Sequence, residues 1–236
     1  MMHLLTLCVA IGLDRVIGDP PALWSRLPHP VVLFGAAISA LEKHLNTARF
    51  TPDGRRLNGV LSILLLLFVS VMGGAVLSWL FHFFGLAGFL FEAVVAAVFI
   101  AQKSLGDHVQ AVARGLKRDG VEGGRLAVSM IVGRDPKTLD GPGVCRAAIE
   151  SLSENFADGV VAPAFWYAIA GLPGLLAYKM LNTADSMIGH KNERYIDFGW
   201  ASARLDDLAN WPAARISALL IALAAWLRLG WDAGRM

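Results

Sequence analysis

The region between residues 140 and 207 contains most of the side chains that could carry out chemistry. Glu150, Glu154 and Asp158 recur every four residues, so on a helix these carboxylates share one face. Like charges at this spacing repel each other unless a cation lies among them. Carboxylate oxygens are the ligands that Mg²⁺ takes in proteins, usually together with several waters. This acidic face is therefore a candidate site for a hard cation, and a solvated outer face of a helix is an equally good interpretation.

A second polar patch lies on the segment 178–188. On a helix Lys179, Asn182, Thr183 and Ser186 face one way with Asp185 beside them, and the opposite face is apolar. A lysine among amide and hydroxyl groups can bind a phosphate as a point charge, and the aspartate could reach a metal ion. The alternative is an amphipathic helix at the membrane edge, whose lysine extends its charged end into water.

Three further residues near the N-terminus are candidate contacts for a substrate. Asp14 and Asp19 follow a short apolar segment, and His29 stands between two prolines. The histidine could contact a substrate or simply cap the next helix. The chain has no G-x-x-x-x-G-K-[ST], G-x-G-x-x-G or G-x-S-x-G sequence, so any use of a nucleotide must depend on other residues.

Composition indicates a membrane protein. Of 236 residues 56% are hydrophobic and only 17% are charged, whereas about a quarter of a soluble domain is charged. The formal net charge of +2 comes without a basic run, which argues against a nucleic-acid partner. Cys8 and Cys145 have no zinc-site spacing, and we expect both to stay reduced thiols.

Hydropathy divides the chain, as one domain over 1–236, into segments. A helix that crosses a bilayer needs about 20 residues, so the apolar segment 2–13 is too short to cross. We expect two short helices within 1–45 and a polar loop over 46–56, which together form an N-terminal region over 1–56. The transmembrane helices are expected at 57–81, 86–101 and 208–229, so that 57–101 forms a helix pair. The region 102–207 is expected to hold amphipathic helices, the first of them ending at Gly120.

The helix that carries the acidic face also needs a buried side. Cys145, Ile149, Leu152 and Phe156 recur at helical spacing opposite the carboxylates. We therefore expect these four side chains to pack against the rest of the protein.

The distribution of lysine and arginine predicts the topology. The segments 46–56 and 103–158 are rich in both, which places them on the cytoplasmic side. A full crossing by 159–178 would separate the two polar patches, but the Gly171–Gly174 sequence Gly-Leu-Pro-Gly interrupts it. A re-entrant hairpin over 159–178 would keep both patches on one face, and we prefer it. The predicted fold is an all-α polytopic integral membrane protein with such a hairpin and cytoplasmic amphipathic helices.

The ordered set of short motifs along the chain resembles the adenosylcobinamide-phosphate synthase family, the cobalamin biosynthesis proteins CobD/CbiB. The resemblance extends nearly from end to end. It is carried by Leu13-Asp14-Arg15, Gly18-Asp19-Pro20, His29-Pro30-Val31, Gly133-Arg134-Asp135, Arg146-Ala147-Ala148-Ile149-Glu150-Ser151, Glu154-Asn155, Asp158-Gly159, Ala162-Pro163, Tyr178-Lys179, Asn182-Thr183-Ala184-Asp185-Ser186-Met187 and Ala203-Arg204-Leu205-Asp206-Asp207.

The resemblance implies an ATP-dependent ligase. Its substrates would be a propionate of adenosylcobyric acid, a corrinoid, and (R)-1-amino-2-propanol or its phosphate, joined by an amide bond. Transfer of a phosphoryl group needs cations aimed at the developing charge. We therefore assign catalytic roles to Lys179, Asp185, Glu150 and Glu154. Mg²⁺ would be held by Glu150, Glu154, Asp158 and Asp185, and substrates would be contacted by Asp14, Asp19, His29, Asn155, Asn182, Ser186, Arg204 and Asp206.

The resemblance also predicts where the protein works. It implies a multi-pass protein of the inner (cytoplasmic) membrane with its active face in the cytoplasm. The lipid bilayer and other membrane-bound enzymes of cobalamin assembly would be its neighbours. Family members continue beyond the last helix with a further polar motif, so the chain ending at Met236 is expected to be short for the family.

Two other functions are compatible with the residues. One is a non-enzymatic membrane sensor or accessory protein of the AmpE type, and the other is a small-solute transporter that uses the hairpin and Asp185 as an ion site. A transporter should hold its polar groups near the middle of the membrane, whereas here they gather at one edge. A sensor has little need of carboxylates, a lysine and an amide on facing helices. Both considerations favour the ligase.

Overall fold

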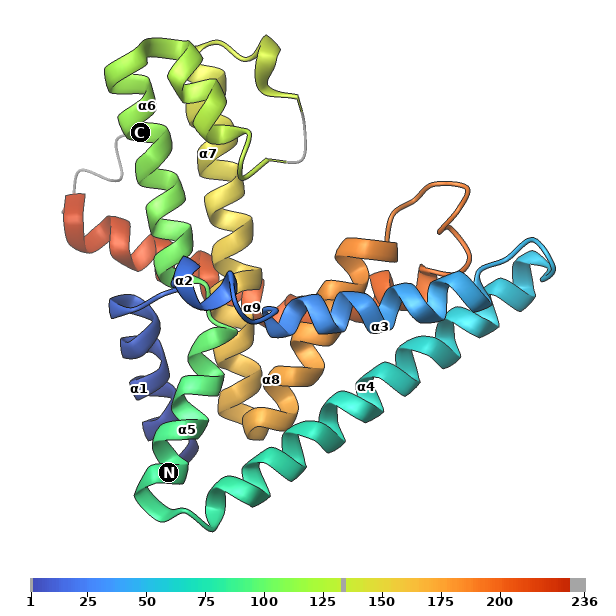
Figure 1. Cartoon of the computed structure of the whole chain (residues 1–236). Helices are drawn as coiled ribbons and strands as arrows, with labels where there is room; N and C mark the ends of the chain where they lie inside the picture. Colours follow the sequence, from blue (N-terminus) through green and yellow to red (C-terminus); the bar gives the residue numbers. More distant parts are fainter. Residues whose placement is uncertain (1, 133–134, 230–236) are drawn as a thin grey trace.

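The computed structural model describes residues 2–132 and 135–229, and within these ranges the chain is helical, without a β-strand. Figure 1 shows that α6 and the first turns of α7 project beyond the other helices as a separate lobe. The α-helices in chain order are α1 (Met2–Val16), α2 (Pro21–Trp24), α3 (Pro30–Leu45), α4 (Pro52–His82), α5 (Gly85–Val98), α6 (Gln102–Val128), α7 (Gly141–Phe156), α8 (Ala162–Ile188) and α9 (Trp200–Leu229). A 3₁₀ turn, η1 (Pro136–Thr138), precedes α7, and a π-helical turn, η2 (Ala157–Val161), joins α7 to α8.

The N-terminal region contains the short helices that the sequence predicted. The Asp14 carboxylate, at the end of α1, accepts hydrogen bonds from the backbone N–H groups of Gln102 and Lys103 at 2.9 and 3.2 Å. It therefore caps the start of α6, where the first N–H groups have no partner within the helix. Burial raises the pKa of Asp14, and the two backbone hydrogen bonds oppose that rise. Asp14 thus fastens α1 to α6.

The expected loop over 46–56 is shorter than predicted, because α4 already begins at Pro52. Thr51 is its N-cap, and the Thr51 hydroxyl accepts a hydrogen bond from the N–H of Gly54 at 3.2 Å. A proline is favourable in the first turn of a helix, where its missing N–H has no role. The predicted transmembrane helix 57–81 lies wholly inside α4.

The helix expected over 86–101 ends earlier, at Val98, and α6 starts at Gln102 after a short break. The backbone N–H of Ala101 donates to the carbonyl of Gly159 at 2.9 Å, which ties this break to the π-helical turn. At Gly120 the backbone takes φ 65° and ψ −152°, a conformation almost confined to glycine. The predicted end of the amphipathic helix at Gly120 is therefore confirmed as a sharp bend.

The predicted buried stripe of α7 is wrong by about one residue. Cys145 is exposed and Ile149 is 64% exposed, while the fully buried positions are Val144, Ala147, Ala148 and Ser151. Leu152 and Phe156 do pack against the core, as predicted. Small residues occupy the buried side because α7 lies close against α6, where a Cβ added at Gly124 would approach Val144 to 3.2 Å. Hydrophobicity alone pointed to the larger side chains, which instead face outward.

The segment 159–178 does fold into a helical hairpin. Gly171 has φ 62° and ψ −150°, and the chain reverses there between the two limbs of α8. A Cβ added at Gly174 would overlap the carbonyl O of Trp166, which shows how closely the limbs meet. The hairpin packs against α4, where Gly74 leaves room for the backbone at Pro173. Small residues allow this close approach of helices.

Among the described residues, the segments long and apolar enough to cross a membrane are Pro52–His82, Gly85–Val128, Gly141–Ile188 and Trp200–Arg228. Many large apolar side chains on α4, α5 and α9 point outward, which suits lipid rather than water. The last helix begins at Trp200, before the predicted start at 208, so Arg204 and Asp206 lie within α9. The chain is therefore an all-helical, multi-pass membrane protein.

Candidate functional site

A lysine within electrostatic range of three carboxylates lies where the π-helical turn η2, α8 and α9 meet. The Lys179 ammonium interacts electrostatically with the carboxylates of Asp158, Asp206 and Asp19. These partners come from the π-helical turn, from α9 and from the segment after α1. The helical hairpin places Lys179 beside Asp158, although 21 positions separate them in the chain. A lysine ammonium can bind a phosphate as a point charge, and the neighbouring carboxylates can hold a second cation or accept a proton.

The π-helical turn η2 determines where Asp158 lies. A π turn inserts an extra residue into a helix and is common at functional sites. Asp158 lies within η2, in electrostatic reach of Glu154 on α7 and of Asp185 on α8. The turn thus connects the acidic face of α7 to the polar patch of α8.

Tyr178 and Asn210 connect the two limbs of the hairpin to α9. The Tyr178 hydroxyl lies 3.1 Å from the carbonyl O of Asp158 and 2.8 Å from Oδ1 of Asn210. The Asn210 amide in turn donates to Oδ2 of Asp206 at 2.8 Å. Asp206 is only 7% exposed, and within the described residues its Oδ1 has no hydrogen-bond partner. A buried carboxylate oxygen without a partner is costly, and a bound cation or donor at this point would satisfy it.

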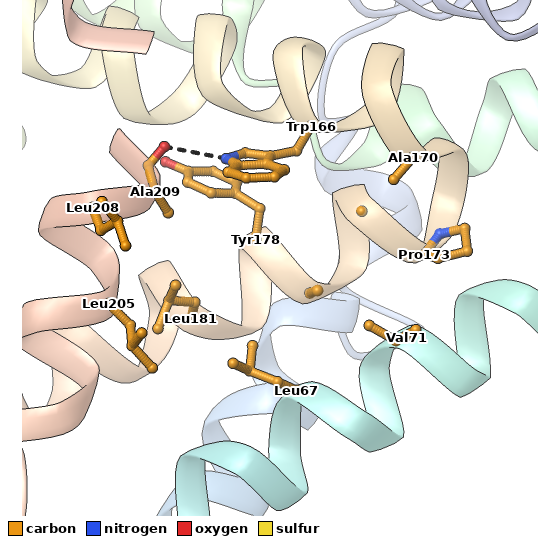
Figure 2. Close-up of a pocket in the computed structure, with 12 residues that line it drawn as sticks. Leu67, Val71, Trp166, Ala170, Pro173, Tyr178, Leu181, Leu205, Leu208 and Ala209 are labelled. Carbon is orange, nitrogen blue, oxygen red and sulfur yellow. Dashed lines mark hydrogen bonds between the residues drawn. The ribbon is translucent and has the colours of Figure 1, made fainter. Parts of the chain in front are cut away.

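An apolar pocket of about 420 Å³ adjoins this cluster. Figure 2 shows the rings of Trp166 and Tyr178 lying one beside the other, with Leu67 and Val71 of α4 on the facing wall. The Trp166 indole N–H donates to the carbonyl O of Ala209 on α9 at 3.2 Å. Tyr178 therefore separates an apolar space from the polar cluster that its hydroxyl reaches.

The N-terminal candidates differ in their surroundings. Asp19 accepts a hydrogen bond from the Trp24 indole at 3.2 Å, and its carboxylate lies 3.8 Å from Nε2 of His29. His29 is the N-cap of α3, accepting from the N–H of Val31 through Nδ1 at 3.2 Å. The capping interpretation of His29 is thus confirmed, and its other nitrogen still faces Asp19. Asp14 caps α6, whereas Asp19 lies within electrostatic range of Lys179.

The acidic face of α7 is brought together only in part. Glu154 interacts with Asp158, while Glu150 is exposed earlier on the helix. Asn155 donates through its amide to the carbonyl of Ser151 at 2.8 Å. Among residues 2–132 and 135–229, no three His, Cys, Asp or Glu side chains are grouped closely enough to hold a metal ion. The four-carboxylate metal site therefore stays a prediction.

The polar patch of α8 is as predicted on its buried side, where Met180, Leu181 and Ile188 pack in the core. Asp185 interacts with Asp158, Asp206, Asp207 and His190.

Asn182, Ser186 and Arg204 were also predicted to contact a substrate. The Ser186 hydroxyl donates to the carbonyl of Asn182 at 2.9 Å, and Asn182 lies beside Asp206. Arg204, the predicted substrate contact on α9, is exposed.

The sequence interpretation gave no role to Tyr178 or Asn210. Asn210 is an amide one helical turn after Asp206, in an otherwise apolar stretch of α9, and this spacing was the available signal. Tyr178 precedes Lys179 directly, so on a helix it points toward a different side. Only the hairpin shows that this side faces Asp158.

The fold and the site together define a class: a multi-pass helical membrane protein with an ionisable cluster at a bent helical hairpin. The family model described as "CobD/Cbib protein" matches residues 7–235, and the chain belongs to this family.

Several curated relatives are named "Cobalamin biosynthesis protein CobD". The one from Rhizobium meliloti (strain 1021) is 65% identical over 232 residues, which covers 98% of this chain and 71% of that protein. The one from Brucella suis biovar 1 (strain 1330) is 56% identical, covering 99% of this chain and 72% of that protein. One from Rhodobacter capsulatus is 51% identical, covering 92% of this chain and 68% of that protein. No solved structure matches the chain.

The comparison supports a role in cobalamin biosynthesis. Of the motifs that carried the resemblance, Gly133 and Arg134 lie outside the described residues.

Proposed function

We propose that the chain is an ATP-dependent ligase that joins a propionate carboxylate of adenosylcobyric acid to the amino group of (R)-1-amino-2-propanol or its phosphate. The observation that carries the proposal is Lys179, held among Asp158, Asp206 and Asp19 by the hairpin, in a chain of the CobD/CbiB family. Such a cluster is expensive next to apolar helices, which favours function over structure as its reason.

The proposed reaction has two steps. The propionate oxygen attacks the γ-phosphoryl group of ATP, which releases ADP and leaves an acyl phosphate. The amine nitrogen then attacks the acyl carbon, the amide C–N bond forms, and inorganic phosphate departs. Lys179 would bind the transferring phosphoryl group as a point charge. A carboxylate of the cluster, Asp158 or Asp206, would accept the proton that the amine loses.

Asp206 could supply a ligand to a magnesium ion, because within the described residues its buried Oδ1 has no hydrogen-bond partner and the carboxylates of Asp158 and Asp185 lie within electrostatic range. Mg²⁺ is usually held by one or two carboxylates with substrate phosphates, so a complete protein cage is not required. A bound Mg²⁺ would neutralise charge on the phosphate oxygens. Of the predicted ligands, Asp158 and Asp185 are better placed for this role than Glu150, and Asp206 joins them.

The experiment uses the purified chain in lipid nanodiscs. Amide product and ADP are measured by mass spectrometry with all substrates present and with each one omitted. The proposal expects both products only when ATP, Mg²⁺, adenosylcobyric acid and the amine are all present. Lys179→Met should abolish both products, whereas Lys191→Met, at an exposed lysine beyond α8, should not. Amide formation that survives Lys179→Met would contradict the proposal.

We also propose that the Lys179 cluster lies on the cytoplasmic side of the inner membrane. The support is the lysine and arginine content of α6 and of the segment 46–56, because positive residues are enriched on the cytoplasmic side of membrane proteins. Single cysteines at His190 and at Phe84, in a Cys8→Ala/Cys145→Ala background, place the two ends of the bundle. A membrane-impermeant thiol reagent added to intact cells should label position 84 and not position 190. Labelling of position 190 would contradict this topology.

A further inference from the structure

A single carboxylate interrupts the longest apolar stretch of the chain. Between Arg56 and Lys103, Glu92 is the only Asp, Glu, Lys or Arg. It lies on α5, within a segment apolar enough to cross a membrane. A charged side chain in such a segment is costly and marks a site unless it is fully satisfied by neighbours.

Tyr167 holds the Glu92 carboxylate in place from the first limb of α8. Its hydroxyl donates to Oε1 of Glu92 at 2.6 Å, and the Tyr167 side chain is wholly buried. Thr6 of α1 also forms a hydrogen bond with Tyr167, and the His3 ring meets the tyrosine ring edge-on at 6.2 Å between centroids. Side chains of α1, α5 and α8 thus converge on the carboxylate.

Glu92, Thr6 and His3 line a pocket of about 380 Å³ that α4 completes. Ser78, Phe81 and His82 contribute from α4, and Phe89 from α5. Within the described residues the buried hydroxyl of Ser78 has no hydrogen-bond partner. In Figure 1 the turn between α4 and α5 and the bend of α8 lie at the end of the molecule away from the α6–α7 lobe. This pocket is therefore separate from the Lys179 cluster.

We propose that the Glu92 pocket binds a small organic ammonium group. A carboxylate supplies the opposite charge, and the aromatic rings of Phe81 and Phe89 supply faces for a cation–π contact. Hydroxyl and imidazole groups can accept the ammonium hydrogens. A metal ion fits less well, because Glu92 is the only carboxylate among the described residues that line this pocket.

The ammonium group can come from a free amine or from the headgroup of phosphatidylethanolamine. The pocket lies where α4 ends and α5 begins, at the border of two segments able to cross the membrane, so both sources can reach it. The chemistry of the contact is the same in both cases. This inference is independent of the proposed ligase activity, since none of these residues belongs to the Lys179 cluster.

The free amine is tested by calorimetric titration of ethanolamine into the chain in phosphatidylcholine nanodiscs, with ethylene glycol as the neutral analogue of similar size. The lipid is tested by native mass spectrometry after exposure to equal amounts of phosphatidylethanolamine and phosphatidylcholine. The proposal expects saturable binding of ethanolamine or selective retention of phosphatidylethanolamine, and no binding of ethylene glycol.

Glu92→Gln should weaken that binding by at least about tenfold, because the negative charge that pairs with the ammonium group is removed. The amide can still accept the Tyr167 hydrogen bond, so the fold should persist. Glu122→Gln, at the carboxylate that pairs with Arg125 on α6, is the control and should change nothing. Phe89→Leu provides a second variant that keeps the charge and should weaken binding severalfold.

Absence of binding in both arms would overturn the proposal. Equal binding of ethylene glycol, or unchanged binding by Glu92→Gln and Phe89→Leu, would show that Glu92 serves only as a hydrogen-bond partner of Tyr167 and would overturn it as well.

Discussion

The hydroxyl of Tyr178 lies 3.1 Å from the main-chain carbonyl O of Asp158, and this contact joins the π-helical turn to the returning limb of α8. The same hydroxyl reaches Asn210, whose amide holds Asp206. Tyr178 links the π-helical turn, α8 and α9. Lys179 follows Tyr178 in the chain and therefore lies between Asp158 and Asp206. The polar cluster is therefore built by the backbone turn and the tyrosine, and not by the lysine itself.

Removing that hydroxyl should destabilise the protein. Tyr178→Phe leaves the partners of a buried hydrogen bond unsatisfied, which costs about 1–3 kcal/mol. Thermal unfolding in detergent should show a lower midpoint for this variant. Tyr195→Phe is the control, because within the described residues no hydrogen bond involves the Tyr195 hydroxyl. Equal stability of the two variants would show that the Tyr178 contact is not structural.

The bend of the hairpin should be sensitive to any side chain. Gly171→Ala places a residue with a Cβ in a backbone conformation almost confined to glycine, at a cost of about 1–3 kcal/mol. Gly120→Ala is a matched control, since Gly120 has nearly the same φ and ψ and open space around it. We expect a similar loss of stability in both variants and loss of amide formation only in Gly171→Ala. Full activity of Gly171→Ala would contradict the role of the bend.

Gly189 sets the position of Asp185. A Cβ at this residue would overlap Oδ1 of Asp185, so Gly189→Ala must displace the carboxylate. We expect its amide formation to fall by about tenfold or more, because one misplaced group in a catalytic cluster commonly costs that much. Gly106→Ala, where nothing lies within 4 Å, should keep its activity. The comparison requires rates measured at equal amounts of folded protein, and equal rates would show that Asp185 has no part in the reaction.

The pH dependence of stability should report on Asp14. Burial raises the pKa of Asp14 in the folded protein, so between the unfolded and the folded pKa the native state holds a proton that the unfolded chain has lost. The contribution of this group to stability is complete below the unfolded pKa and is lost as pH rises through the folded pKa. Relative to Asp14→Asn, the wild-type protein should therefore lose stability as pH rises from about 4. A constant difference in unfolding midpoint across that window would contradict this assignment.

Sequence patterns predicted the helices that hydrophobicity determines and the break that glycine and proline encode. The helix 57–81 and the reversal at Gly171–Gly174 follow from local chemistry, so both were predictable. The buried side of α7 was not, because Ala147 and Ala148 are buried by a close approach to α6 that only the tertiary fold defines. Mutual placement was likewise inaccessible: nothing local indicates that Asp206 on α9 would lie near Lys179 on α8. The residue types identified the candidate site residues. The hairpin and the π-helical turn determine which of these residues lie close together.

The role of the hairpin cluster in amide synthesis is tested most directly by a double-mutant comparison of Lys179 and Asp206. Rates of amide formation are measured in nanodiscs for Lys179→Met, Asp206→Asn and the double variant, at matched amounts of folded protein. If both residues act on one transition state, each single change should remove nearly all activity, and the double variant should be hardly slower than either. Mild losses that add in free energy, and that follow the loss of stability of each variant, would contradict a shared catalytic role.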